Sequence, residues 1–354
     1  MVYHVKKVFP HSQCISIPFS DGGEGALNVL ENHAHGSLVW CKTTDALKRP
    51  INAPYFLFKK EKTAWVELSQ TAGLAILDET ERNPLKTSTW GTGLMLKKVL
   101  DKGCEKIYLG IGGSATHDLG LGIITALGGK LYNKEGKILE ACGENLSQIE
   151  SIDLSELDPR VKKIKWIIAC DVQNLLTGKN GASHTYAKQK GATSQIIEQL
   201  ETGSKQFAKI VKKQFGKDIG TLLGGGAAGG VSAGLFGVFN ASLNKGFELL
   251  AQLTELDYKI KNMDLVLTGE GNFDRQSTFG KLPIQVAKLS LPYKIPTLLF
   301  TGRASLKELS EMPHLKIYQI TPPSMLIAEA MEKASQNIND KLLEVLQDFK
   351  NKSY

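Results

Sequence analysis

The sequence predicts an α/β protein with largely parallel sheets. Short apolar runs alternate with helical patterns, and glycine-dense loops follow several of these runs. The chain of 354 residues is also long enough for two domains, because one hydrophobic core usually stops growing at about 250–300 residues. A hydrophobic content of 42% and a charged content of 22% are those of an ordinary globular protein.

Each apolar run is short and is bounded by polar residues, glycine or proline, which is typical of a buried strand. In chain order, strands are expected at residues 14–19, 64–68, 106–112, 165–171, 264–269 and 297–302. Helical patterns follow many of them, for example at residues 91–102, 195–215 and 328–349. No apolar run reaches the roughly 18 residues of a membrane span, so no membrane association is expected.

The formal net charge of +7 is modest for this length. A group of lysines (Lys205, Lys209, Lys212, Lys213 and Lys217) lies in a helical pattern without interleaved aromatic residues, which indicates a solvated helix face rather than a nucleic-acid surface. The sign of the charge suits a small anionic ligand. Five cysteines without a C-x-x-C pair favour a reducing cytoplasm and disfavour a disulfide framework.

Four loops are dense in glycine: "SDGGEGAL" from Ser20, "GIGGSATHDLGLG" from Gly110, "GGGAAGGVSAGL" from Gly224 and "DLVLTGEGNFDRQSTFGKLP" from Asp264. Such loops lie where α/β enzymes bind ligands, beyond the carboxyl ends of strands. Glycine lets a ligand approach backbone N–H groups closely, which makes an anion site. For "GGGAAGGVSAG" the alternative interpretation is close packing of a helix on a sheet.

Nucleotide motifs of other folds match poorly. Gly110, Gly112 and Ala115 satisfy the dinucleotide fingerprint, but Glu135 is a poor candidate for the acid that binds the ribose. A nicotinamide-dependent oxidoreductase therefore stays an alternative that would need saturable NAD or NADP binding. The sequence has no Walker A motif, and it has no G-x-S-x-G elbow for a serine hydrolase.

Acidic residues recur beside these glycine loops. They are Asp21, Glu24, Asp118, Asp171, Glu270 and Asp274. Each of them taken singly could be solvated or could cap a helix. Together they suit Mg²⁺, which takes one or two carboxylates plus phosphate oxygens, and phosphoryl transfer also needs a base. Lys281 adds a cation close in sequence to Glu270 and Asp274.

Seven motifs in order resemble the bacterial glycerate kinases of the first type, over nearly the whole chain. They are "SDGGEGAL", "NPLKTSTWGTG", "GIGGSATHDLG", "ACDVQNLLTGKNGAS", "QKGAT", "GGGAAGGVSAGL" and "LVLTGEGNFDRQSTFGKLP". The resemblance implies ATP- and Mg²⁺-dependent phosphorylation of D-glycerate, with 2-phosphoglycerate as the associated product. It also implies a flavodoxin-like domain and a domain resembling a restriction-enzyme core, with the site in the cleft between them.

The resemblance carries over to individual positions, to which we assign roles as hypotheses. Expected catalytic residues are Asp274 (base or metal ligand), Lys281 (on phosphate) and Glu270. Expected ATP-binding residues are Asp21, Gly22, Gly23, Gly112, Gly113, Ser114, Gly229 and Gly230. Expected Mg²⁺ ligands are Glu24, Asp118 and Asp171.

The resemblance also implies an opening strand with an aspartate-serine-phenylalanine-lysine-glycine signature, about twenty residues ahead of Met1. Other departures from the family pattern include His117, Leu119 and Leu175. Two explanations stay open: a chain start placed too far downstream, or a paralogue that binds a small hydroxy acid or nucleotide without turnover. We expect a cytoplasmic enzyme, with an oligomer possible. The flavodoxin-like domain is expected at residues 1–40 plus 243–354, with the second domain inserted at residues 41–242.

Overall fold

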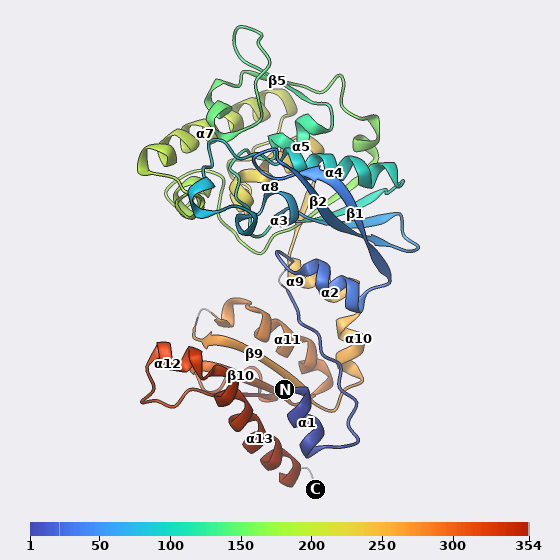
Figure 1. Ribbon diagram of the computed structural model, residues 1–354, viewed down its shortest axis with the longest axis vertical. Helices are drawn as coiled ribbons and strands as arrows, with labels where there is room; N and C mark the ends of the chain where they lie inside the picture. Colours follow the sequence, from blue (N-terminus) through green and yellow to red (C-terminus); the bar gives the residue numbers. More distant parts are fainter. Residues whose placement is uncertain (21, 276, 353–354) are drawn as a thin grey trace. The chain divides into compact units, whose positions relative to one another are not determined.

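The computed structural model describes residues 1–20, 22–275 and 277–352. The chain forms two compact units, which are described separately (Figure 1). The smaller unit combines Met1–Pro18 with Glu255–Tyr354, and the larger unit is Phe19–Thr254. The domain borders expected from the sequence differ from these edges: they fall within strands β1 (Gly36–Thr44) and β8 (Ser242–Asn244). In the described parts of the chain, no helix combines the length and apolar character needed to cross a bilayer.

A six-stranded mixed sheet organises the larger unit, in the order β1-β2-β3-β4-β7-β8. β1 and β2 form a long antiparallel pair (Figure 1). β2 and β3 are also antiparallel, and β3, β4, β7 and β8 run parallel. A separate antiparallel pair joins β5 and β6. The remaining strand bounds are β2 (Pro50–Phe58), β3 (Thr63–Glu67), β4 (Lys106–Gly110), β5 (Lys130–Tyr132), β6 (Ser151–Asp153) and β7 (Lys165–Ala169).

Both faces of this sheet are covered, and the alternation of side chains along each strand divides the core in two. In β4, Ile107 and Leu109 join the main core with residues of α4, α5, α7 and α8, whereas Tyr108 joins a second cluster with residues of α2 and α9. β3 and β7 alternate in the same way. The helices are α2 (Ala26–His33), α3 (Ser69–Ala72), α4 (Trp90–Asp101), α5 (Leu121–Ala126), α6 (Ala182–Tyr186), α7 (Ser194–Phe215), α8 (Ala227–Phe239) and α9 (Gly246–Leu253).

The smaller unit contains a three-stranded parallel sheet, β11-β10-β9. Leu298 and Phe300 of β10 pack in a cluster with α1 and α13, and Leu299 packs on the opposite face with α11. The elements are α1 (Val2–Val8), α10 (Leu256–Lys261), β9 (Val266–Phe273), α11 (Leu282–Ser290), β10 (Thr297–Ala304), β11 (Leu315–Gln319), α12 (Ile327–Glu332) and α13 (Ala334–Lys352).

The α/β class with parallel strands is confirmed, and five of the six expected strands are present as β3, β4, β7, β9 and β10. The strand expected at residues 14–19 is wrong, because this segment forms no strand pairing and crosses the edge between the two units. Pro18 in that segment also lacks the N–H that a ladder uses. The helix expected at residues 328–349 is divided into α12 and α13.

Helix α8 begins with an unusual backbone, because Ala228, Gly229 and Gly230 all have left-handed φ and ψ angles. Gly229 and Gly230 are buried. A Cβ on Gly229 would meet the carbonyl oxygen of Thr116 and would lie 2.7 Å from the Cα of His117. Gly229 and Gly234 of "GGGAAGGVSAGL" therefore allow close packing of α8 against the Thr116–Leu119 backbone, which is a loop and not the sheet that the alternative interpretation of this motif expected.

This packing predicts that Gly229→Ala is strongly destabilising. The substitution combines left-handed strain of about 1–2 kcal/mol with overpacking of about 1–3 kcal/mol. Gly216→Ala is the matched control, since Gly216 also has a left-handed φ but a Cβ there would meet nothing within 4 Å. We expect the urea midpoint of Gly229→Ala to fall well below that of Gly216→Ala. Equal midpoints would show that the close approach of α8 to this loop contributes little.

Candidate active site

Four parallel strands of the larger unit end at one edge of the sheet. In the strand pairing, Glu67 lies opposite Gly110, Gly110 opposite Ala169, and Ala169 opposite Asn244. The segments that follow these four residues therefore start side by side. This is the edge at which open α/β sheets bind ligands.

The first glycine loop, residues 22–25, lies directly against this edge. The backbones approach so closely that a Cβ would not fit at the contact positions. A Cβ on Gly110 would lie 2.5 Å from the carbonyl oxygen of Gly22, and one on Gly112 would lie 2.7 Å from the Cα of Gly23. Gly22 itself has φ +92°, and a Cβ there would lie 2.5 Å from the Cα of Gly246. The structure thus brings together Gly22, Gly23 and Gly112 of the expected site, while Asp21 lies outside the described residues.

Glu24 is exposed and lies beside the second glycine loop. A Cβ on Gly113 would be 3.4 Å from Glu24 Oε2, so the carboxylate and this loop are in van der Waals range. Gly113 has φ +70°, a conformation that favours glycine. An exposed carboxylate beside unobstructed backbone is the arrangement expected for a metal–phosphate site.

Glu67 is a residue of this edge that the sequence interpretation missed. Its side chain is fully buried, and its Oε1 accepts the N–H of Leu27 at 2.6 Å while Oε2 accepts Gln70 Nε2 at 2.9 Å. Burial raises the pKa of Glu67, although these hydrogen bonds oppose the shift. By accepting the Leu27 N–H, Glu67 fixes the first turn of α2, directly after the Gly22–Gly25 loop. The available signal was an acid ending the apolar run "AWVEL", as Asp171 ends "WIIACD".

Short backbone hydrogen bonds hold the Gly112–Asp118 loop. Leu74 N–H donates to Gly113 O at 2.8 Å, and Ala115 N–H donates to Ala72 O at 2.7 Å. Ser114 is buried and pairs with Gly73 in an isolated bridge. The loop is therefore a rigid extension of β4 and does not fold into a helix at once, as a dinucleotide-binding turn would.

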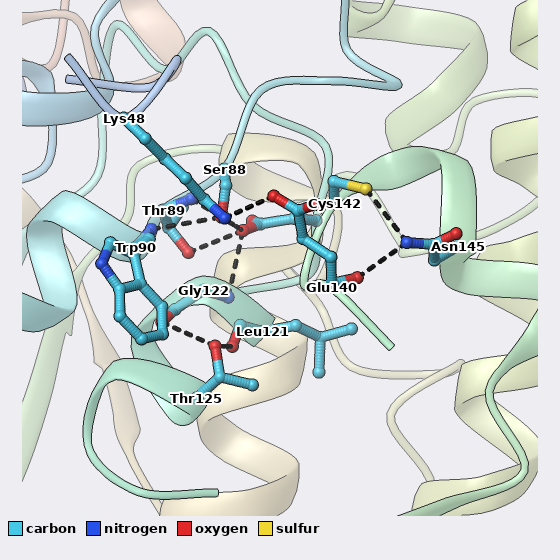
Figure 2. A network of polar contacts seen from close by, with 11 residues as sticks. Lys48, Ser88, Thr89, Trp90, Leu121, Gly122, Thr125, Glu140, Cys142 and Asn145 are labelled. Atoms are coloured by element: carbon cyan, nitrogen blue, oxygen red, sulfur yellow. Dashed lines mark hydrogen bonds and ion pairs between the residues drawn. The ribbon is translucent and has the colours of Figure 1, made fainter. Parts of the chain in front are cut away.

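Asp118 closes this loop from inside the protein. Its carboxylate is fully buried and accepts the Thr89 N–H at 2.7 Å, the Thr89 hydroxyl at 2.8 Å and the N–H groups of Gly122 and Gly120 at 3.1 and 3.2 Å. Figure 2 labels Thr89 and Gly122 in this network. The Ser88 hydroxyl lies at 3.4 Å. Burial raises the pKa of Asp118, and the hydrogen bonds from Thr89 and the glycines oppose that shift. Because Asp118 is fully buried and its Oδ2 accepts from Thr89 and Gly122, it has the environment of a structural carboxylate, which argues against the expected metal role.

Asp171 follows β7 and is exposed. Its two carboxylate oxygens accept the N–H of Gly246, at 3.1 and 3.2 Å, where helix α9 begins. A carboxylate at this position stabilises the positive end of the helix dipole. Because the side chain also reaches solvent, Asp171 combines this capping function with access to a ligand.

In the smaller unit, an ion pair forms where β9 leads toward α11. Lys281 Nζ lies 3.5 Å from Glu270 Oε2 and donates to Asn272 O at 3.4 Å. Glu270 Oε1 is buried and has no hydrogen-bond partner among the described residues. A buried carboxylate oxygen without a donor is costly, so this atom is suited to accept from a bound hydroxyl group or to ligate a cation.

Asp274 lies next to this ion pair in sequence and shapes the turn after β9. Its Oδ2 accepts Asn272 Nδ2 at 2.9 Å, and its Oδ1 accepts the Ser277 N–H at 3.1 Å. Asp274 is half-buried. Asn272 connects the parts of this motif: its carbonyl oxygen accepts from Lys281, which is paired with Glu270, and its side-chain amide donates to Asp274.

Within residues 1–20, 22–275 and 277–352, no group of three or more His, Cys, Asp or Glu side chains is placed to hold a metal ion. Mg²⁺ usually needs only one or two carboxylates, because phosphate oxygens and water complete its coordination. Of the expected ligands, the exposed Glu24 and Asp171 fit this requirement, whereas Asp118 is enclosed.

The chain is similar to known proteins along most of its length. The family model described as "Glycerate kinase family" matches residues 1–350. Glycerate kinase of Bacillus cereus is 37% identical over 333 residues, covering 94% of this chain and 87% of that protein. Glycerate 2-kinase of Escherichia coli is 37% identical over 297 residues, covering 84% of this chain and 78% of that protein.

A solved structure has the same fold. The crystal structure assigned to glycerate kinase 2 of Salmonella typhimurium LT2 superposes with a TM-score of 0.83 and 34% sequence identity, covering 99% of this chain and 92% of the other. The match to the family model over nearly all residues confirms the resemblance carried by the seven motifs. The chain belongs to the glycerate kinase family.

Proposed function

We propose that this protein is an ATP-dependent glycerate kinase that transfers the γ-phosphate of ATP to D-glycerate and forms 2-phosphoglycerate. One observation carries the proposal: in a chain matched by the glycerate kinase family over residues 1–350, two glycine loops and an exposed acid lie at a single edge of parallel strands. The name of the Escherichia coli relative, glycerate 2-kinase, supports the position that is phosphorylated.

Phosphoryl transfer depends mainly on positioning and on stabilising negative charge. In the proposed reaction a hydroxyl oxygen of D-glycerate attacks the γ-phosphorus, the bond from that phosphorus to the bridging oxygen breaks, and ADP leaves. The hydroxyl proton passes to a carboxylate, for which Asp274 and Glu270 are the candidates. Lys281 would contact a phosphate oxygen, exchanging part of its interaction with Glu270 for the ligand.

The larger unit would hold phosphate groups through the backbone of Gly22–Gly23 and Gly112–Ser114. Mg²⁺ would neutralise charge on the phosphates, with Glu24 and Asp171 as its protein ligands. Support for this assignment is the exposure of both carboxylates at the edge where the loops gather. Gly229 and Gly230 would act indirectly, by supporting the Thr116–Leu119 backbone from behind.

Two finer expectations stay part of this proposal. The unit with the β11-β10-β9 sheet would correspond to a flavodoxin-like domain and the larger unit to the restriction-enzyme-like one. A cytoplasmic location is supported by the five cysteines, all of which are free thiols.

The first prediction concerns turnover. Purified protein with D-glycerate and Mg²⁺-ATP should release ADP, and the product should be consumed by enolase, which accepts 2-phosphoglycerate and not 3-phosphoglycerate. L-Glycerate serves as the control substrate. Thermal stabilisation by D-glycerate or ATP without ADP release would instead establish the alternative, a protein that binds these ligands without turnover.

Lys281→Met should lower kcat/KM by about 10²–10³-fold, because the cation proposed to stabilise the transferring phosphate is removed. Lys288→Met is the matched control, since Lys288 is an exposed lysine of α11, the helix that Lys281 directly precedes. Steady-state kinetics with ADP detection measures both variants. Equal activity of the two variants would exclude Lys281 from the site.

Asp274→Asn should lower kcat by about 10²-fold or more if the carboxylate accepts the hydroxyl proton. The amide keeps an acceptor for Ser277, so the turn should persist. Asp264→Asn, an exposed position just before β9, is the control. Unchanged kcat in Asp274→Asn with normal thermal stability would assign the proton to another carboxylate, and Glu270→Gln would then be the variant to measure.

A further inference from the structure

Lys190 is a buried lysine to which the proposed reaction gives no role. It belongs to the "QKGAT" motif and ends a short 3₁₀ turn, Lys188–Lys190. Its residue is only 2% exposed, which is rare for lysine unless the charge has partners. Among the described residues, the ammonium group makes no ion pair within 4.0 Å.

The Lys190 side chain ends on the second glycine loop. Nζ donates to Ser114 Oγ at 2.8 Å and to Thr116 O at 2.7 Å. The turn that carries Lys190 is itself fixed, because Gly191 has φ +90° and a Cβ there would meet the carbonyl oxygen of Arg82. Lys190 therefore holds two alternate residues of the loop from a rigid base.

Burial lowers the pKa of Lys190 to about 7, and the nearby Asp118 carboxylate opposes this shift. Burial also lowers the pKa of the neighbouring His117 to about 3, with a contribution from Lys190, so the imidazole is neutral at pH 7. Such a desolvated amine is costly to bury in the free protein. An anion bound at the loop would offset part of that cost.

The chemistry of this contact fixes the polarity of Ser114. An anion bound beside Lys190 favours its protonated form, which only donates, so the Ser114 oxygen then accepts from Lys190 and its own O–H is left to donate elsewhere. In the part of the chain that the structure describes, the Ser114 hydroxyl makes no hydrogen bond to an acceptor. A hydroxyl held in this way next to Gly112 and Gly113 is a prepared donor for a ligand oxygen.

We propose that Lys190 is a positioning residue that orients the Ser114 hydroxyl to donate a hydrogen bond to an anionic oxygen of the substrate pair. This inference rests on the proposed kinase function. The anionic oxygen belongs either to an ATP phosphate or to the carboxylate of glycerate. Both groups offer an anionic oxygen that accepts a hydrogen bond. They are distinguished by whether the KM for ATP or the KM for D-glycerate rises when the hydrogen bond is lost.

The test is a double-mutant cycle with Ser114→Ala, Lys190→Met and the combined variant, and Lys188→Met as the control. Lys188 is an exposed lysine of the same turn. Each single variant of the cycle should lower kcat/KM by about 10–100-fold, and the combined variant should lie within threefold of Lys190→Met, because both changes remove one donor. A rise of KM for ATP assigns the oxygen to phosphate, and a rise of KM for D-glycerate assigns it to the carboxylate.

Two outcomes would overturn the inference. One is a Lys190→Met protein that melts at lower temperature but keeps kcat and both KM values within twofold, which is the behaviour of a packing residue. The other is Ser114→Ala with wild-type kinetics, which is decisive even if Lys190→Met does not fold. Wild-type turnover of D-glycerate is measured first, so a failure of the kinase proposal is distinguished from a failure of this one.

Discussion

The close approach of backbone to backbone at the sheet edge is the constraint on which the larger unit depends. Gly22 lies between β4 and the start of α9, where neither it nor Gly110 has space for a Cβ. The same condition recurs where Gly229 meets Thr116. Side chains are excluded from these contacts, and the exposed carboxylates of Glu24 and Asp171 lie beside them. Close packing of the backbone and the proposed ligand binding thus both require glycine at these positions.

Strands with continuous apolar runs could be predicted from the sequence, because β3, β4 and β7 are buried on both faces and carry few polar residues. The antiparallel pair β1–β2 was not predicted. β1 has almost no fully buried residues, and Pro50 and Pro54 in β2 interrupt the pattern that indicates a strand. Conversely, residues 14–19 have a strand-like composition but no neighbouring strand to pair with. Composition reports how buried a segment can be, whereas pairing depends on residues far away in sequence.

The candidate site, like the strands, could be predicted from the sequence only in part. Glycine loops and acids at strand ends could be recognised as candidates, since both follow from local sequence. The environment of each acid could not be predicted, because it depends on residues far away in sequence. Thr89 donates hydrogen bonds to the buried Asp118, whereas Gly246 donates to Asp171, which stays exposed. Glu67 and Lys190 were missed for a related reason. A charged residue at the end of an apolar run, or in a short polar motif, is assumed to be solvated until the fold shows what it contacts.

The contacts that shape the Gly112–Asp118 loop have a consequence for biosynthesis. Lys190 reaches Ser114 across 76 positions of the chain, and Gly229 accepts a hydrogen bond from Leu119 across a still longer separation. Strand β4 leaves the ribosome well before either partner exists. The nascent chain must therefore expose an incomplete glycine loop and unpaired strand edges until α8 has been translated. Synthesis rate between these segments, and chaperone capture of the unfinished sheet, thus become determinants of how much active protein a cell obtains.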